Sequence, residues 1–178
     1  MVHVRVVRTF AFLDLCGFTT YTEANGDQAA VAVLADLRAL LRAETADHGV
    51  RVTKWLGDGA MLSGTEAPEV LRCCVHVREQ LAAVSPLPLR GGIAEGPVIM
   101  FEGTDYIGGA VNVAARLCEH AQPNQLLVEA TVAAEQQATI VTRPLPSVLL
   151  SGITAPVEIG EILGVRPLPV SSGTIAAA

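Results

Sequence analysis

The segment at residues 51–64, RVTKWLGDGAMLSG, decides the fold more than any other stretch of this sequence. Its flanking runs at 50–56 and 60–63 predict two strands, because both are rich in apolar residues. Between them, Gly57-Asp58-Gly59 predicts a tight turn, since an Asp-Gly pair between strand-like runs is a strong hairpin signal. The segment therefore indicates a β-hairpin with a carboxylate at its tip.

The regions on either side of this hairpin repeat one pattern. A Val- and Phe-rich strand at 5–13 and an apolar-striped helix at 27–47 precede it, and a helix at 67–83 and a strand at 88–94 follow it. The order β-α-β-β-α-β predicts an α+β fold, a ferredoxin-like split βαβ sheet with helices packed on one face. The C-terminal additions predicted to follow are a strand at 97–101, a helix at 109–121, a strand at 125–129, a short helix at 130–137 and a hairpin of 139–150 and 156–163.

The composition is that of a single globular domain. The chain has 178 residues, of which 51% are hydrophobic and 17% charged, so disordered and low-complexity classes are excluded. We expect one domain over residues 1–166 and a flexible C-terminal tail at 167–178. The net charge of −6 argues against a nucleic-acid partner, which normally requires a basic face.

Cysteine usage and hydropathy favour a cytoplasmic protein. No apolar run approaches the roughly 18 residues of a membrane span, so we expect no direct membrane insertion. The four cysteines have no disulfide or zinc spacing, which favours reduced thiols. The histidines are scattered along the chain and are interpreted as structural or surface residues: His3, His48, His76 and His120.

Two aspartates stand at predicted strand ends. Asp14 interrupts the apolar run FAFLDL near its end, and Asp58 lies at the hairpin tip. A carboxylate in such an apolar setting needs a strong partner, and a divalent cation would be one. Taken singly, each residue is better explained as a turn or capping aspartate, and only their combination favours a metal site.

A third polar cluster lies at the start of the helix at 109–121. Asn112 and Arg116 are four residues apart, so they share one helical face at the rim of the apolar stripe. They have the chemistry to meet a phosphate or a developing oxyanion. The alternative is a solvated face on which Arg116 pairs with Glu119, three positions on.

Taken together, these segments resemble one family. The stretches FAFLDLCGFT (10–19), VTKWLGDGAM (52–61), LRGGIAEGPV (89–98) and GTDYIGGAVNVAARL (103–117) look like the catalytic (cyclase homology) domain of the class III adenylyl and guanylyl cyclases. Order and spacing both match over roughly residues 8–163, in the compact bacterial version of the domain.

The resemblance implies a metal site and a base pocket. Asp14, Asp58 and the backbone carbonyl of Leu15 match the ligands of two divalent cations, Mg²⁺ or Mn²⁺, which support in-line attack of the ribose 3′-hydroxyl on the α-phosphate. Lys54 and Asp105 match the residues that recognise adenine. Lysine donates to adenine N1 and aspartate accepts from the N6 amine, whereas guanine reverses both roles.

The resemblance also implies a shared site. Asn112 matches the residue that orients the ribose, and Arg116 the residue that stabilises charge on the α-phosphate. Because the family divides these roles between subunits, we expect a head-to-tail homodimer. The implied function is an adenylyl cyclase, a phosphorus-oxygen lyase that converts ATP to 3′,5′-cyclic AMP and pyrophosphate in signal transduction.

Two alternatives stay open at this stage. One is a guanylyl or dual-specificity cyclase, which Lys54 and Asp105 argue against. The other is a weakly active nucleotide-binding regulatory domain. It is favoured by Ser151, which stands where the family often has a lysine that grips the β- and γ-phosphates.

Overall fold

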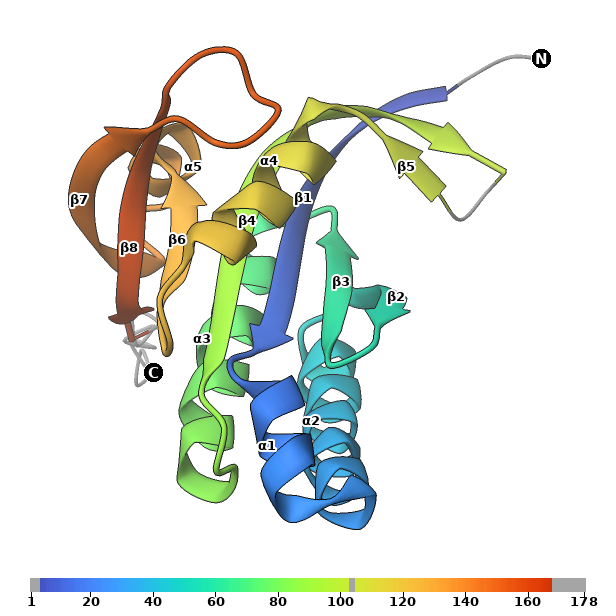
Figure 1. Cartoon of the computed structure of the whole chain (residues 1–178). Coiled ribbons are helices and arrows are strands. Elements are labelled where there is room, and N and C mark those ends of the chain that lie inside the picture. Colours follow the sequence, from blue (N-terminus) through green and yellow to red (C-terminus); the bar gives the residue numbers. More distant parts are fainter. Residues whose placement is uncertain (1–3, 103–104, 168–178) are drawn as a thin grey trace, which may run out of the picture.

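The computed structural model describes residues 4–102 and 105–167. Figure 1 shows the order and arrangement of the helices and strands. In chain order the elements are β1 (Val4–Leu15), α1 (Phe18–Asn25), α2 (Asp27–Asp47), β2 (Arg51–Leu56), β3 (Gly59–Gly64), α3 (Ala67–Val84), β4 (Leu89–Phe101), β5 (Asp105–Ile107), α4 (Gly109–His120), β6 (Leu126–Glu129), α5 (Ala130–Glu135), β7 (Ile140–Val148) and β8 (Val157–Val165).

One mixed sheet organises the described chain. Its strand order is β2-β3-β1-β4-β6-β8-β7, and β5 pairs with the end of β4. The first four strands are antiparallel neighbours, which is the arrangement of a ferredoxin-like split βαβ core. β6 joins parallel to β4, and β8 and β7 complete the sheet, so the predicted α+β core with C-terminal additions is confirmed.

Side-chain alternation along β1 divides the core between the two faces of the sheet. Ala11 and Leu13 point into the larger cluster, which is covered by α2 and α3, the helices of the split βαβ core. Phe10 and Phe12 point to the opposite face, where α4 crosses β1 and β4 (Figure 1). The helix that carries Asn112 and Arg116 is therefore separated by the sheet from the two core helices.

Three local elements differ from the sequence expectations. β4 is one strand of 13 residues instead of two, because it pairs with β1 without interruption from Leu89 to Met100. α1 was not expected, since none of its residues is buried and it has no apolar stripe. β5 was also not expected, because at three residues it is too short to show a periodicity.

The expected domain boundary at residue 166 lies next to the last residue that the structure describes. β8 ends at Val165, close to the predicted boundary at residue 166. The expected tail lies almost wholly outside the described residues, because the structure describes nothing after residue 167. Within the described ranges, no helix combines the length and apolar character needed to cross a bilayer.

Candidate active site

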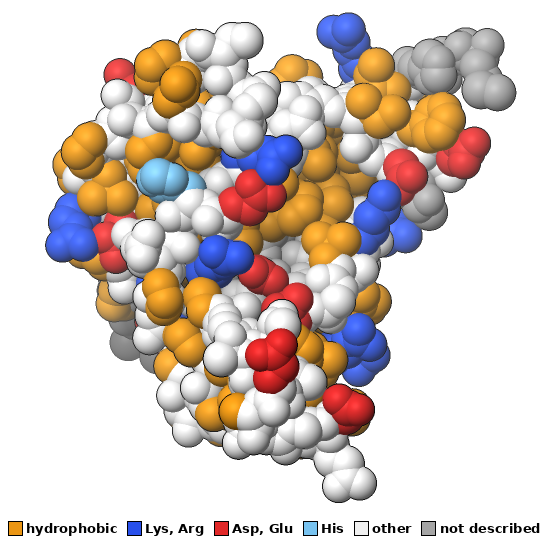
Figure 2. Space-filling view, viewed as in Figure 1, with side chains coloured by type: hydrophobic (Ala, Val, Ile, Leu, Met, Phe, Trp, Pro, Cys, Tyr) orange, Lys and Arg blue, Asp and Glu red, His pale blue; other side chains and the backbone are white. Residues whose placement is uncertain are grey.

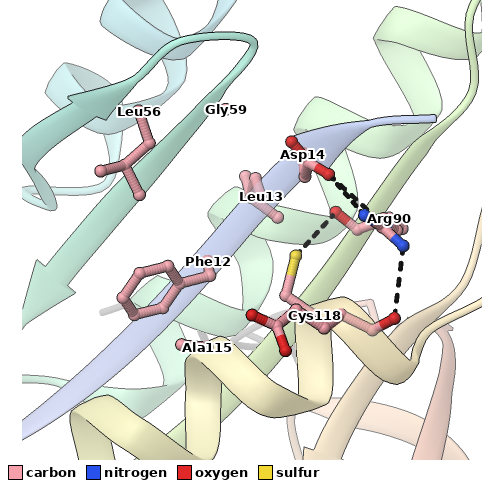
Figure 3. Close-up of a pocket in the computed structure, with 9 residues that line it drawn as sticks. Phe12, Leu13, Asp14, Leu56, Gly59, Arg90, Ala115 and Cys118 are labelled. Carbon is pink, nitrogen blue, oxygen red and sulfur yellow. Dashed lines mark hydrogen bonds and ion pairs between the residues drawn. The ribbon is translucent and has the colours of Figure 1, made fainter. Parts of the chain in front are cut away.

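A hollow opens on the face of the sheet that carries α4. Figure 2 shows acidic and basic side chains around an apolar floor on this side of the molecule. The cavity beside Asp14 has a volume of about 260 Å³ and lies between β1, the β2–β3 hairpin and α4 (Figure 3). Its lining includes Phe12, Leu56, Arg90 and Cys118.

The backbone brings Asp14 and Asp58 to the same corner, which we call the carboxylate corner. Asp14 pairs in register with Gly59, the residue after Asp58, and the Leu15 N–H donates to the Asp58 carbonyl at 3.3 Å. A Cβ on Gly59 would lie 2.5 Å from the Leu13 carbonyl oxygen, so only glycine permits this close approach of β3 to β1. The predicted hairpin thus delivers its tip carboxylate to the end of β1.

Arg90 is the cation of the carboxylate corner. Its Nε and Nη2 donate to Oδ2 of Asp14 at 3.1 and 2.8 Å, as Figure 3 shows, and both side chains are less than one-third exposed. The sequence analysis did not single out Arg90. The signal that identifies it is the pairing of β1 with β4, which places Arg90 opposite Asp14.

The electrostatics of the corner suit a divalent cation. Partial burial, followed by the nearby Asp14 carboxylate, raises the pKa of Asp58, while its own backbone hydrogen bond and Arg90 lower it. The two carboxylates supply hard oxygen ligands, which Mg²⁺ and Mn²⁺ prefer. Burial also raises the pKa of the Cys118 thiol to about 12, so this neighbour stays protonated near neutral pH.

Lys54 and Asp105 meet in space although they lie on different strands. The Lys54 Nζ is 2.6 Å from Oδ1 of Asp105, which joins β2 to the start of β5. Both side chains are about half exposed, so solvent screens the pair and it contributes little to folding. The structure therefore brings together the two residues that the sequence analysis assigned to the base pocket.

The outward face of α4 borders a second cavity of about 280 Å³. Asn112, Arg116 and Ser151 line it together. Arg116 pairs with Glu119 through contacts of 2.7 and 2.8 Å, which is the ion pair that the sequence analysis named as an alternative. The two cavities adjoin because Ala115 and Glu119 line both, yet neither Asn112 nor Arg116 borders the cavity beside Asp14.

Comparison with known proteins begins with sequence relatives. No family model matches the chain. An uncharacterised protein of Mycobacterium tuberculosis is 32% identical over 120 residues, covering 67% of this chain and 32% of that protein. A pH-sensitive adenylate cyclase of the same species is 33% identical over 125 residues, covering 70% of this chain and 31% of that protein. The chain thus spans about a third of the length of these curated relatives.

Solved structures share the fold. The adenylyl cyclase CyaB from P. aeruginosa superposes with a TM-score of 0.83 at 22% identity, covering 93% of this chain and 98% of that one. The guanylyl cyclase Cya2 superposes with a TM-score of 0.80 at 23% identity, covering 96% and 98% of the two chains. Both nucleotide specificities therefore occur on this fold, so the fold alone does not select the base.

Proposed function

The chain has the fold of the class III adenylyl and guanylyl cyclase catalytic domains, as the sequence motifs indicated, and we propose that it is an adenylyl cyclase. It would convert ATP to 3′,5′-cyclic AMP and pyrophosphate. The observation that carries the choice of ATP is the 2.6 Å contact between Lys54 and Asp105. Adenine offers an acceptor at N1 and a donor at N6, which match an ammonium group beside a carboxylate.

Guanine fits the same pair poorly. Its N1–H would face the Lys54 ammonium and its O6 would face the Asp105 carboxylate, so both contacts would set like groups against each other. Sites that hydrogen-bond a substrate discriminate strongly against analogues that leave polar groups unpaired. The proposed pocket therefore disfavours GTP.

The carboxylate corner is proposed to hold two divalent cations through Asp14, Asp58 and the Leu15 carbonyl. Bound Mg²⁺ or Mn²⁺ supplies charge stabilisation for both the attacking and the leaving oxygen of an in-line displacement. Arg90 holds the Asp14 carboxylate in place by two hydrogen bonds to one oxygen. The other oxygen, Oδ1, lies on the Gly59 side, next to the turn that carries Asp58.

The cavity beside α4 is proposed to bind the reacting part of the nucleotide. Asn112 would orient the ribose, and Arg116 would stabilise the charge that develops on the α-phosphate as pyrophosphate leaves. Among the described residues, the ion-pair partner of Arg116 is the exposed Glu119, so a phosphate can replace that partner. Ser151 lines the same cavity and would donate one hydrogen bond to the triphosphate.

A head-to-tail homodimer is part of this proposal. Within one chain, the cavity at Asp14 is lined by neither Asn112 nor Arg116. A second copy facing the hollow would add those side chains to the carboxylate corner, and each copy would complete a site on the other. The named cyclase relatives and the two solved cyclase domains supply the precedent for this fold as a catalytic unit.

One observation favours a second candidate, a nucleotide-binding regulatory domain with little turnover. Ser151 is uncharged and lies in the cavity with Asn112 and Arg116, where a lysine would attract the β- and γ-phosphates. Binding without turnover would identify this candidate.

The test is cyclic nucleotide formation by the purified chain with ATP or GTP and Mn²⁺, alongside nucleotide binding. We expect cyclic AMP from ATP, little product from GTP, and loss of product in the Asp58→Ala variant. The matched control is Asp36→Ala, which removes an exposed aspartate from the middle of α2. ATP binding without product would favour the regulatory domain, and equal use of GTP would overturn the assignment of Lys54 and Asp105.

A further inference from the structure

A cluster of imidazole and carboxylate groups lies on the other side of the sheet from α4. Glu44 and His48 are one turn apart at the C-terminal end of α2, and His76 faces them from α3. These two helices pack against each other behind the sheet (Figure 1). We propose that Glu44, His48 and His76, called here the histidine cluster, bind a Zn²⁺-type transition-metal ion.

The three ligand atoms form a triangle of suitable size. The Nε2 of His48 is 3.1 Å from the Nδ1 of His76, and Oε2 of Glu44 lies 3.7 and 3.5 Å from these two nitrogens. A tetrahedral Zn²⁺ with bonds of about 2.0–2.1 Å places its ligand atoms about 3.4 Å apart. The triangle therefore matches one face of a zinc tetrahedron without a rearrangement of the helices.

A second ring of contacts orients the ligands. Glu69 accepts a hydrogen bond from Nδ1–H of His48 at 2.8 Å, which leaves the Nε2 lone pair of His48 directed toward the triangle. Gln80 donates to Oε1 of Glu44, which leaves Oε2 for the metal. Protein metal sites commonly fix the tautomer of a ligating histidine and the orientation of a carboxylate in this way.

Burial and charge also favour a cation here. Glu44 is only 8% exposed, so its carboxylate needs a compensating partner. Among the described residues its ion pairs are with His48 and His76, which are uncharged unless protonated. The His76 side chain is 36% exposed, so a metal ion can reach the cluster from solvent. Two imidazoles and one carboxylate select Zn²⁺ or Co²⁺ over Mg²⁺.

The experiment is a Zn²⁺ titration of the full chain against a chromophoric chelator, with Co²⁺ as a spectroscopic probe. We expect one equivalent of tight binding and a tetrahedral Co²⁺ spectrum in the wild type. Both should be lost in His76→Gln and kept in His120→Gln, which changes an exposed histidine on α4. They should also persist in Asp58→Ala, so the result is independent of the proposed cyclase activity.

A second variant guards against a folding defect. Glu69→Gln keeps all three ligands and should lower the Zn²⁺ affinity about 10–100-fold by weakening the orientation of His48. Far-UV circular dichroism checks that each variant is folded. Unchanged Zn²⁺ affinity in folded His76→Gln, or in Glu69→Gln if His76→Gln does not fold, would overturn the proposal. So would a wild-type Co²⁺ spectrum that is octahedral or shows thiolate ligation.

Discussion

The carboxylate corner in the hollow and the histidine cluster behind the sheet both gather acidic groups, but they are assembled differently. Backbone pairing places Asp14 and Asp58 together, through the register of β1 with β3 and the close approach at Gly59. In the histidine cluster, side chains from two helices reach toward each other across a packed interface. A site that is positioned by backbone contacts depends on the pairing of the whole sheet. A site that is formed by side chains can be altered by substitution without a change in the backbone.

The two clusters also differ in ligand chemistry. Oxygen ligands dominate the carboxylate corner, where the nearby cation is Arg90. Burial, and after it the nearby Asp14 carboxylate, raises the pKa of Asp58. The histidine cluster sets two imidazole nitrogens beside one buried carboxylate. Hard and borderline cations would therefore partition between the two sides of one sheet, with Mg²⁺ or Mn²⁺ in the hollow and Zn²⁺ behind it.

The largest expected effect tests whether the hollow carries the chemistry. Arg116→Ala should lower kcat for cyclic AMP formation about 10²–10³-fold, because it removes the charge that is proposed to stabilise the α-phosphate in the transition state. Steady-state kinetics at saturating ATP measures this. The control, Glu119→Ala, breaks the same ion pair but keeps the arginine, and its kcat should stay within several-fold of the wild type. Equal losses in both variants would contradict a role for Arg116.

The second-largest expected effect tests whether the hollow depends on the close backbone contact between α4 and β4. A Cβ on Gly92 would lie 2.2 Å from the Cys118 nitrogen and 2.3 Å from the Ala114 carbonyl oxygen. Gly92→Ala should therefore push α4 from β4 and lower the free energy of unfolding by about 1–3 kcal/mol or more. Urea denaturation measures this change.

A glycine at the start of α4 provides the matched control for Gly92. Gly109 has no neighbouring atom within 4 Å of an added Cβ. Gly109→Ala should raise the free energy of unfolding by about 0.5–1 kcal/mol, because alanine loses less backbone entropy in a helix. If Gly92→Ala is no less stable than Gly109→Ala, the contact of α4 with β4 is looser than described.

The smallest expected effect concerns the stability of the histidine cluster. Without added metal, Glu69→Gln should change the free energy of unfolding by less than about 1 kcal/mol, because the Glu69 side chain is 43% exposed. Thermal or urea denaturation in the presence of a chelator measures this. If the free energy of unfolding fell by several kcal/mol, the fold would depend on the contacts of the histidine cluster, as it does on those of the carboxylate corner.

Much of the fold was predictable from local patterns. The hairpin around Gly57-Asp58-Gly59, the helices α2 and α3 and the order of the core strands follow from apolar periodicity and turn chemistry. α1 escaped prediction because it buries no residue, and the continuity of β4 depends on its pairing with β1, which no local window contains.

The candidate site was predictable in its residue types but not in its partners. The motifs identified Asp14, Asp58, Lys54, Asp105, Asn112 and Arg116, and the structure gathers them into the corner, the ion pair and the rim of α4. The pairing of Arg90 with Asp14 and the meeting of His48 with His76 had no such signal. The sequence alone favours structural or surface roles for His48 and His76, because neither stands at a recognised ligand spacing from a Cys or Asp.

By itself, the sequence determined most of the segments that become helices or strands, which of their faces are apolar, and which residue types stand at the ends of β1 and at the tip of the hairpin. Only the tertiary structure decided which side chains meet across elements. The physical reason is that periodicity and turn preferences act over a few residues, whereas strand register and helix packing result from many contacts between distant segments. The carboxylate corner and the histidine cluster both exist through contacts of that second kind.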